Sequence, residues 1–544
     1  MIKSLPILLF FLPVVCFAQP KITTSTAFET DSKGTLSTLG LLKTGQGDNF
    51  LMVYRSAKLG SRFGPPKVHY TWAADVFTPD LKKLSGSELK KIEFPDGEDA
   101  EYGFAVNFGG GPYLLLQEHK KKEGKMIVYH CAIDQTGAIG KPKRLGSYSV
   151  REEESGSYRG VHISPDSATL LLIFLPSLED PKDPISFIAF DRNWSTLQTG
   201  KLPMPNIDAN ILIKGIYFGE HSEIWMPAWV KANDQESLQQ ELWVWRDLKA
   251  APQRIDVQLA PDKLITDMDI ARSETDGAIY VAGLYGAHSK KALKSMFRSS
   301  ASSPRDKHPA QGTFFLKIDP EKQTIDTRHE APFRSQALRF WALSEKDIEK
   351  GEGISILGVQ EIAPQPDGSI FFTVEQYFED AGSPINPANP TGLRHSGGPR
   401  CGPAIAVHYD ASGKQDQEVL LKKQVMSVHG SGVGHRMFTH RGAALFVYND
   451  HEDNIARPPE QNSGLKPCRV ADVEGMVMGQ KDAFTAMYYV DKAGRGNPKA
   501  LFNFKEAGYW FDRHACLKLS PTRYILGCDG RTGQYGLLRV DMPE

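Results

Sequence analysis

A short strand-forming segment that ends on an aspartate recurs along this 544-residue chain, and it limits the folds open to the chain more than any other feature. The six copies are Ile127–Asp134, Phe187–Asp191, Phe314–Asp319, Ile405–Asp410, Met487–Asp491 and Leu537–Asp541. Each copy is rich in the aromatic and branched side chains that favour β-strands. A unit of this size cannot bury a core by itself, so its repetition indicates stacked supersecondary modules.

Each aspartate-ended strand follows a hairpin, and a second turn leads from the aspartate into a fourth segment. The aspartate can accept hydrogen bonds from the backbone of its own turn, which explains its recurrence without a catalytic role. Each module is therefore predicted to be a four-stranded antiparallel meander, and radial repetition of meanders gives an all-β fold, the β-propeller. The Ser-Pro-Asp turn at Ser164 and the Pro-Asp-Gly turn at Pro366 resemble those of bacterial β-propellers in general. This resemblance covers nearly the whole mature chain and concerns a superfold, not one family.

The two ends of the chain predict how the ring closes. The last module stops at Glu544 after its third strand, whereas Lys21–Phe28 alternates as a strand should. We expect this N-terminal strand to complete the C-terminal blade and so remove an exposed sheet edge. Residues 19–544 are predicted to form a single β-propeller domain of eight blades, or of seven if the meander at 37–93 is irregular.

Residues 1–18 have the pattern of a secretory signal peptide, with Lys3 before an apolar run and Ala18 at the end. The run is too short to span a bilayer, and no later run is longer. The mature protein is therefore predicted to be exported, to the periplasm or the medium, with no membrane span. Acylation of Cys16 is the disfavoured alternative, because Pro13-Val14-Val15 lacks the small residues of a lipoprotein site.

Charge and cysteine content restrict the partners and the crosslinks. The 64 basic and 65 acidic side chains are not segregated, which argues against nucleic acid as a partner. Five cysteines remain after the signal peptide, an odd number. Cys131 lies within an apolar strand and is predicted to be a buried thiol. For two candidate pairs, a disulfide and separate thiols both stay open: Cys516 with Cys528, and Cys401 with Cys468.

The long insertions are expected to share one face. In a meander blade, the turns between strands one and two and between strands three and four lie on one face, and the remaining connections lie on the other. Long loops on a rigid scaffold commonly carry binding and catalysis, so the second face is the predicted working surface. Its insertions are 175–185, 231–240, 284–312, 332–356, 377–403 and 449–484.

The innermost strand of each blade begins on this face, so its first residues are expected to surround the mouth of the central channel. A structural interpretation has these polar residues paired with one another in solvent. The sharper interpretation is a site for a polar ligand. The candidate residues are Arg159, His162, Lys214, Asp269, Glu361, His435, Arg436, Arg513 and His514.

No cofactor and no metal site is predicted. The histidines gather after residue 390, but no pair has the spacing of a helical zinc site. Asp450, Glu452 and Asp453 offer oxygen ligands for calcium, with an ordinary acidic loop as the simpler interpretation.

Two classes of function follow. The first is a scaffold whose long-loop face and channel mouth bind a protein or a polar or carbohydrate ligand; it is favoured because a fold alone implies no chemistry. The second is an enzyme, a hydrolase or lyase acting on a polar substrate such as a carbohydrate. In that case His435 or His514 acts as acid or base, and Arg436 or Arg513 holds an anion.

Overall fold

A computed structural model gives the fold of the chain. It describes the following residues: 19–32, 35–45, 47–59, 68–100, 102–149, 160–164, 166–174, 185–205, 209–213, 215–219, 223–232, 238–288, 309–341, 343–379, 399–427, 433–457, 464–470, 482–530 and 533–543. The predicted signal peptide lies outside this part of the chain. No helix among the described residues is long and apolar enough to cross a membrane.

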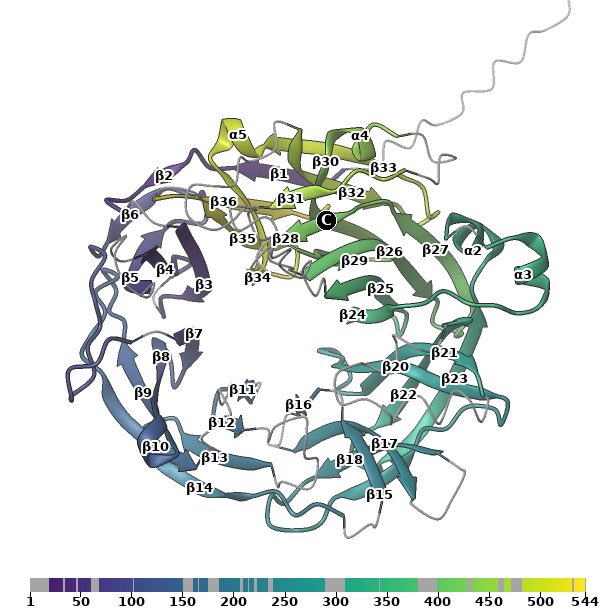
Figure 1. Cartoon of the computed structure of the whole chain (residues 1–544), viewed down its shortest axis with the longest axis horizontal. Helices are drawn as coiled ribbons and strands as arrows, with labels where there is room; N and C mark the ends of the chain where they lie inside the picture. The colour runs from purple at the N-terminus through teal and green to yellow at the C-terminus, as the bar shows by residue number, and fades with distance from the viewer. Residues whose placement is uncertain are drawn as a thin grey trace, which may run out of the picture.

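Antiparallel meanders, most of them of four strands, are arranged as a ring, with the first strand of most of them nearest the centre (Figure 1). The chain is thus an all-β protein with the β-propeller fold. Its units contain β3–β6 (Thr35–Lys43, Phe50–Leu59, Val68–Phe77, Lys83–Gly86), β7–β10 (Tyr102–Phe108, Gly111–Lys120, Lys125–Ala132, Lys143–Ser149), β11–β14 (Gly160–Ile163, Thr169–Phe174, Ser186–Asp191, Thr196–Lys201) and β15–β19 (Ala209–Ile213, Tyr217–Phe218, Ile224–Ala232, Leu238–Trp245, Gln253–Asp256).

The second half of the ring carries most of the inserted helices and strands of the described chain. Its units contain β20–β23 (Lys263–Arg272, Ile279–Ala287, Gly312–Asp319, Thr324–Pro332), β24–β27 (Leu357–Pro364, Ile370–Glu379, Pro399–Tyr409, Gln415–Leu421), β29, β30, β32 and β33 (His435–His440, Ala443–His451, Ala483–Val490, Gly496–Asn503), and β34–β36 (Tyr509–Ser520, Arg523–Gly530, Gln534–Asp541). The inserted elements are α2 (Ser335–Phe340), α3 (Glu345–Glu349), β28 (Val425–Ser427), α4 (Glu452–Ile455), β31 (Cys468–Val470) and α5 (Phe504–Ala507).

The N-terminal strand completes the last unit, as predicted. β1 (Lys21–Thr24) pairs antiparallel with β36, and β2 (Phe28–Glu29) pairs with the start of the same strand. The Phe28 ring stacks on Tyr535, 5.3 Å between centroids. One residue pair, Leu36 with Gly530, joins this unit to β3–β6 as a nine-stranded sheet. Counting hydrogen-bonded sheets gives seven and dividing this sheet gives eight, so the blade number stays a prediction.

The recurring aspartates organise the turns after the third strands. Asp134 Oδ1 accepts hydrogen bonds from the backbone N–H of Thr136 and Ala138, at 2.8 and 2.9 Å. Asp191, Asp410 and Asp491 bind the backbone two and four residues ahead in the same way. This confirms that the motif aspartate is a turn residue. The last copy, Asp541, instead pairs with Arg523 and Arg539.

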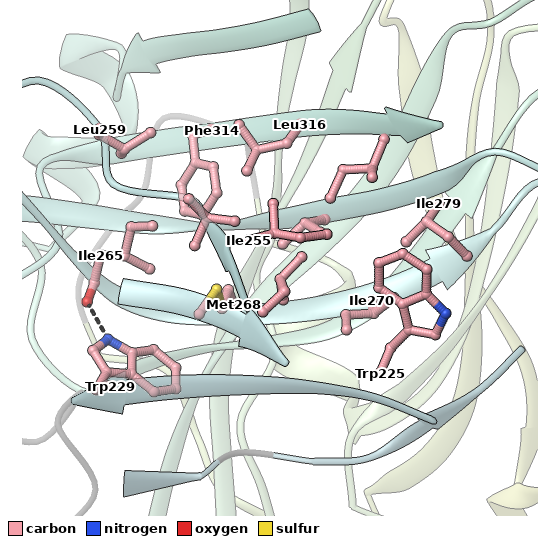
Figure 2. Close-up of a cluster of buried hydrophobic side chains, with 14 of the residues drawn as sticks. Trp225, Trp229, Ile255, Leu259, Ile265, Met268, Ile270, Ile279, Phe314 and Leu316 are labelled. Carbon is pink, nitrogen blue, oxygen red and sulfur yellow. Dashed lines mark hydrogen bonds between the residues drawn. The ribbon is translucent and has the colours of Figure 1, made fainter. Parts of the chain in front are cut away.

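Apolar clusters between neighbouring units hold the ring together. Figure 2 shows one of them, in which Trp225 and Trp229 of β17 face Met268 and Ile270 of β20. The Trp229 indole N–H donates to the Ile265 carbonyl at 2.9 Å, so this buried polar group is satisfied across the interface. A fully buried aromatic or aliphatic side chain contributes about 1.5–3 kcal/mol, which makes each interface a rigid support for the loops above it.

All five cysteines of the described chain are free thiols, and Cys131 is buried as predicted. Cys401 and Cys468 pair with Val425 from opposite sides. They are therefore separated by two strand spacings of about 4.8 Å, too far for the Cβ separation of about 4 Å in a disulfide. Cys516 is opposite Leu526, two residues from Cys528. Such diagonal positions are about 7 Å apart, so this candidate pair is not bridged either.

Candidate functional site

Three inner strands bring polar side chains together near their first residues. We call this set the mouth cluster: Gln360, Glu361, Arg436, Arg513 and His514. They come from β24, β29 and β34, which begin three consecutive units of the ring. Arg513 Nη1 donates to Gln360 Oε1 at 2.8 Å, although the two residues are 153 positions apart and β29 belongs to the unit between them. Four of the predicted site residues therefore belong to one local arrangement.

A large bulge in β34 aims Arg513 and His514. Phe511 pairs with Cys528 and Cys516 pairs with Leu526, so the four residues from Asp512 to Ala515 are opposite Gly527 alone. A bulge of this kind removes side chains from the regular alternation and redirects them, and bulges are common beside functional sites. The Asp512 carboxylate supports the turn by accepting the backbone N–H of His514 at 3.2 Å.

The second arginine of the mouth cluster is neutralised. Arg436 Nη1 lies 2.9 Å from Glu361 Oε1, and the other oxygen of Glu361 accepts the backbone N–H of Met437. Although burial alone would lower the pKa of the Arg436 guanidinium, the Glu361 charge raises it. This pair matches the structural interpretation of the channel-mouth charges.

His435 lies below the surface. Its side chain has 0% exposure, and Nε2 is 2.8 Å from Thr373 Oγ1. Beneath it, the fully buried Glu375 carboxylate pairs with the fully buried Lys423 ammonium and lies 3.4 Å from His435 Nδ1. Glu375, Lys423 and His435 are called the buried ion cluster below. The prediction that His435 contacts a ligand at the channel mouth needs correction, since its fully buried side chain lies against Thr373 and Glu375 of the neighbouring unit.

Burial and charge oppose each other at Glu375. Burial would raise the pKa of its carboxyl group, but the charges of Lys423, His435 and Arg513 outweigh burial and hold the pKa at about 2.

At Asp450, one of the candidate calcium ligands, burial has the larger effect. It raises the pKa of the carboxyl group to about 7, although hydrogen bonds from Asn454, His451 and Gln424 lower it. Asp453, another of the candidate calcium ligands, pairs with Lys466. No group of three or more His, Cys, Asp or Glu side chains among the described residues is placed to hold a metal ion.

The remaining predicted residues do not join the mouth cluster in any described contact. His162 on β11 packs edge-on against Phe218, with 6.2 Å between ring centroids. Asp269 on β20 binds the backbone N–H of Ile270 at 2.8 Å. Arg159 and Lys214 fall outside the described residues.

His514 is the exposed member of the mouth cluster. Protein groups around the ring lower the pKa of its imidazole through desolvation, and the charges of Arg513 and Arg436 lower it further against the opposing effect of Asp512. The ring is therefore neutral at pH 7 and can accept a proton or a hydrogen bond.

Two clefts lie away from the mouth cluster. The larger, of about 610 Å³, lies at the short turns of the β15–β19 and β20–β23 units. Of its three basic residues, Arg246 and Arg272 donate to backbone carbonyls and Lys317 pairs with Asp276. The other, of about 370 Å³, lies between the segment that follows β6, residues 87–95, and the turn after β9.

Sequence reasoning missed Gln360, Glu375 and Lys423. A neutral glutamine carries no signal of function by itself. The two charged residues did carry a signal, because Glu375 directly follows the strand-forming segment Ile370–Val374 and Lys423 lies between Leu421 and Val425. A charge in a buried segment needs a partner, which is a reason to search for one.

No protein-family model and no curated protein sequence matches this chain. Among solved structures it is similar to a polysaccharide lyase (TM-score 0.37, 9% identity, 84% of this chain and 93% of that chain) and to a puromycin hydrolase (0.36, 10%, 90% and 58%). It is also similar to an acylaminoacyl peptidase of Pyrococcus horikoshii (0.33, 11%, 92% and 59%). The chain spans less than two thirds of the hydrolase and of the peptidase. At these scores the similarities carry no activity or substrate over to this chain.

Proposed function

We propose that this β-propeller binds a polar ligand at the mouth cluster on its long-loop face. The observation that carries the proposal is the β34 bulge, which places Arg513 against Gln360 of a unit two positions away and leaves His514 exposed. Binding sites combine a rigid support with a few convergent polar groups. Here the apolar interfaces and the buried ion cluster supply the support, and Arg513, His514 and Gln360 supply the polar groups.

The experiment is a binding screen with neutral and acidic glycans by titration calorimetry, followed by the variant Arg513→Ala/His514→Ala. The double variant should lose binding while its free energy of unfolding changes by no more than about 1 kcal/mol, because partly solvated groups contribute little to folding. Lys518→Ala is the matched control, since Lys518 is on the same strand and pairs with Glu274 elsewhere. A double variant that binds like the parent, or that unfolds, would contradict the proposal.

A second candidate is an enzyme, a hydrolase or lyase, acting on the same ligand. The observation that favours it is the neutral His514 ring beside two guanidinium groups. A neutral imidazole can take a proton as general base while cations stabilise the developing negative charge. The same screen separates binding from turnover: the enzyme candidate requires new chain ends in the glycan, and His514→Ala must abolish their formation while leaving binding in place.

A further inference from the structure

Arg513 has a neutral side chain as its partner, whereas Arg254 and Arg436 pair with carboxylates. Arg254 pairs with Glu241, at 2.5 Å, and Arg436 pairs with Glu361, at 2.9 Å. Arg513 donates to the Gln360 amide oxygen, and none of the described carboxylates lies within ion-pair distance of it. A guanidinium has five N–H groups in a planar fork, so most of its binding capacity is left for another acceptor.

The carboxylates near Arg513 are occupied by other groups. Glu361 is held by Arg436 and by a backbone N–H, and Glu375 is held by Lys423 beneath the surface. Asp512, directly before Arg513, accepts the N–H of His514. Each of these acids is already engaged, and the described hydrogen-bond partner of the Arg513 guanidinium is the neutral Gln360. Arg513 is therefore in no described ion pair, although its charge reaches the buried Glu375 carboxylate.

The backbone makes room for this guanidinium. Gly434 has φ +86°, and a Cβ added there would lie 2.5 Å from Arg513 Nη1 and 2.8 Å from its Cδ. Glycine is thus needed at this position for its conformation and for the passage of the Arg513 side chain. A side chain held this closely is partly preorganised, which reduces the entropy lost when it binds a ligand.

We infer that Arg513 binds an oxyanion of the ligand, a carboxylate or a sulfate ester. The inference rests on the proposed function, because it names the group recognised at the same site. The planar fork of arginine matches a carboxylate or sulfate with two parallel hydrogen bonds, which are stronger than bonds between neutral groups. Gln360 fixes Nη1 and leaves the other N–H groups for the anion.

The test uses matched pairs of polymers that differ in the anion alone. Polygalacturonate is compared with its carboxyl-reduced form, and dextran sulfate with dextran, by titration calorimetry at fixed ionic strength. At least one acidic polymer should bind about tenfold or more tightly than its neutral counterpart, the scale of one charge-assisted hydrogen bond. The two pairs distinguish a carboxylate ligand from a sulfate ester.

Variants then assign the preference to Arg513. Arg513→Gln should reduce the affinity for the acidic polymer to that for the neutral one, and Gly434→Ala should do the same by displacing the guanidinium. Gly110→Ala is the matched control, because Gly110 also has φ +86° but has no atom within 4 Å of an added Cβ. Lys518→Gln, which removes one exposed positive charge from the same strand, controls for nonspecific attraction.

The outcomes separate this inference from the proposed function. Suppose that acidic and neutral polymers bind equally well and that Arg513→Ala/His514→Ala abolishes both. This result would refute recognition of an oxyanion by Arg513 but would leave the proposed binding site in place. An acid preference that survives Arg513→Gln would also overturn the inference. Failure of all four polymers to bind would overturn both.

Discussion

Replacing Lys423 with methionine tests how much the buried ion cluster contributes to the free energy of unfolding. Lys423 and Glu375 both have 0% side-chain exposure, and His435 above them is equally buried. Methionine keeps much of the volume of lysine but removes its charge. The Glu375 carboxylate would then lie in the protein interior without its closest cation.

The expected cost follows from the pKa of Glu375. A pKa lowered from 4.5 to about 2 corresponds to roughly 3 kcal/mol of stabilisation of the carboxylate. Removing one partner of a buried pair generally costs about 3–5 kcal/mol. Without Lys423, burial should raise the pKa of Glu375 above its value in the unfolded chain. The variant should therefore be more strongly destabilised at pH 7 than at pH 4, where the carboxyl group can be protonated.

Urea unfolding at pH 4 and pH 7 measures this cost. Lys518→Met is the matched control, because Lys518 and Glu274 are 2.7 Å apart but 43% and 81% exposed, and exposed pairs contribute about 0–1 kcal/mol. Lys423→Met/Glu375→Leu, which removes both charges, should recover most of the lost stability. A Lys423→Met variant within about 1 kcal/mol of the parent at pH 7 would refute the reasoning.

Two further predictions concern ring closure and pH. Deleting residues 19–30 removes β1 and Phe28 and exposes the edge of β36, so the melting temperature should fall or the protein should aggregate; an unchanged melting temperature would show that closure does not need this strand. The pKa of Asp450 is raised to about 7, so its contribution to stability is fully present below pH 3.8 and is lost as the pH rises through 7. Asp450→Asn should therefore gain stability over the parent at pH 8 compared with pH 5, and equal unfolding midpoints of the two proteins at both pH values would contradict this.

The fold could be predicted because its signals are local and repeated. Asp134 and its counterparts organise turns within four residues of themselves, so the same short pattern marks one unit after another. The pairing of β1 with β36 could also be predicted. The C-terminal unit lacks an outer strand and the N-terminal strand belongs to no other unit, so pairing the two covers the exposed edge. Both inferences need the strand order alone.

The candidate site depends on register, which the sequence pattern does not reveal. Reading back from each turn found Glu361, Arg436, Arg513 and His514, but it assumed that inner strands alternate regularly. In β34 four residues are opposite Gly527, and this bulge decides that Arg513 meets Gln360. The burial of His435 could not be predicted either, because it depends on contacts with Thr373 and Glu375 of a neighbouring unit.

Stability and recognition meet at the backbone of Gly434 and His435. Glu375 of the buried ion cluster lies 3.4 Å from His435 Nδ1, and Arg513 passes Gly434 so closely that an added Cβ would lie 2.5 Å from its Nη1. Loss of the cluster should therefore weaken both folding and binding, since the backbone under the guanidinium loses its anchor. Gly434→Ala should weaken binding beyond the cost of its positive φ, which Gly110→Ala measures separately. The support and the recognition group are distinct parts of one site, so a Lys423 variant should affect folding and binding together, whereas a Gly434 variant should affect binding beyond its cost in stability.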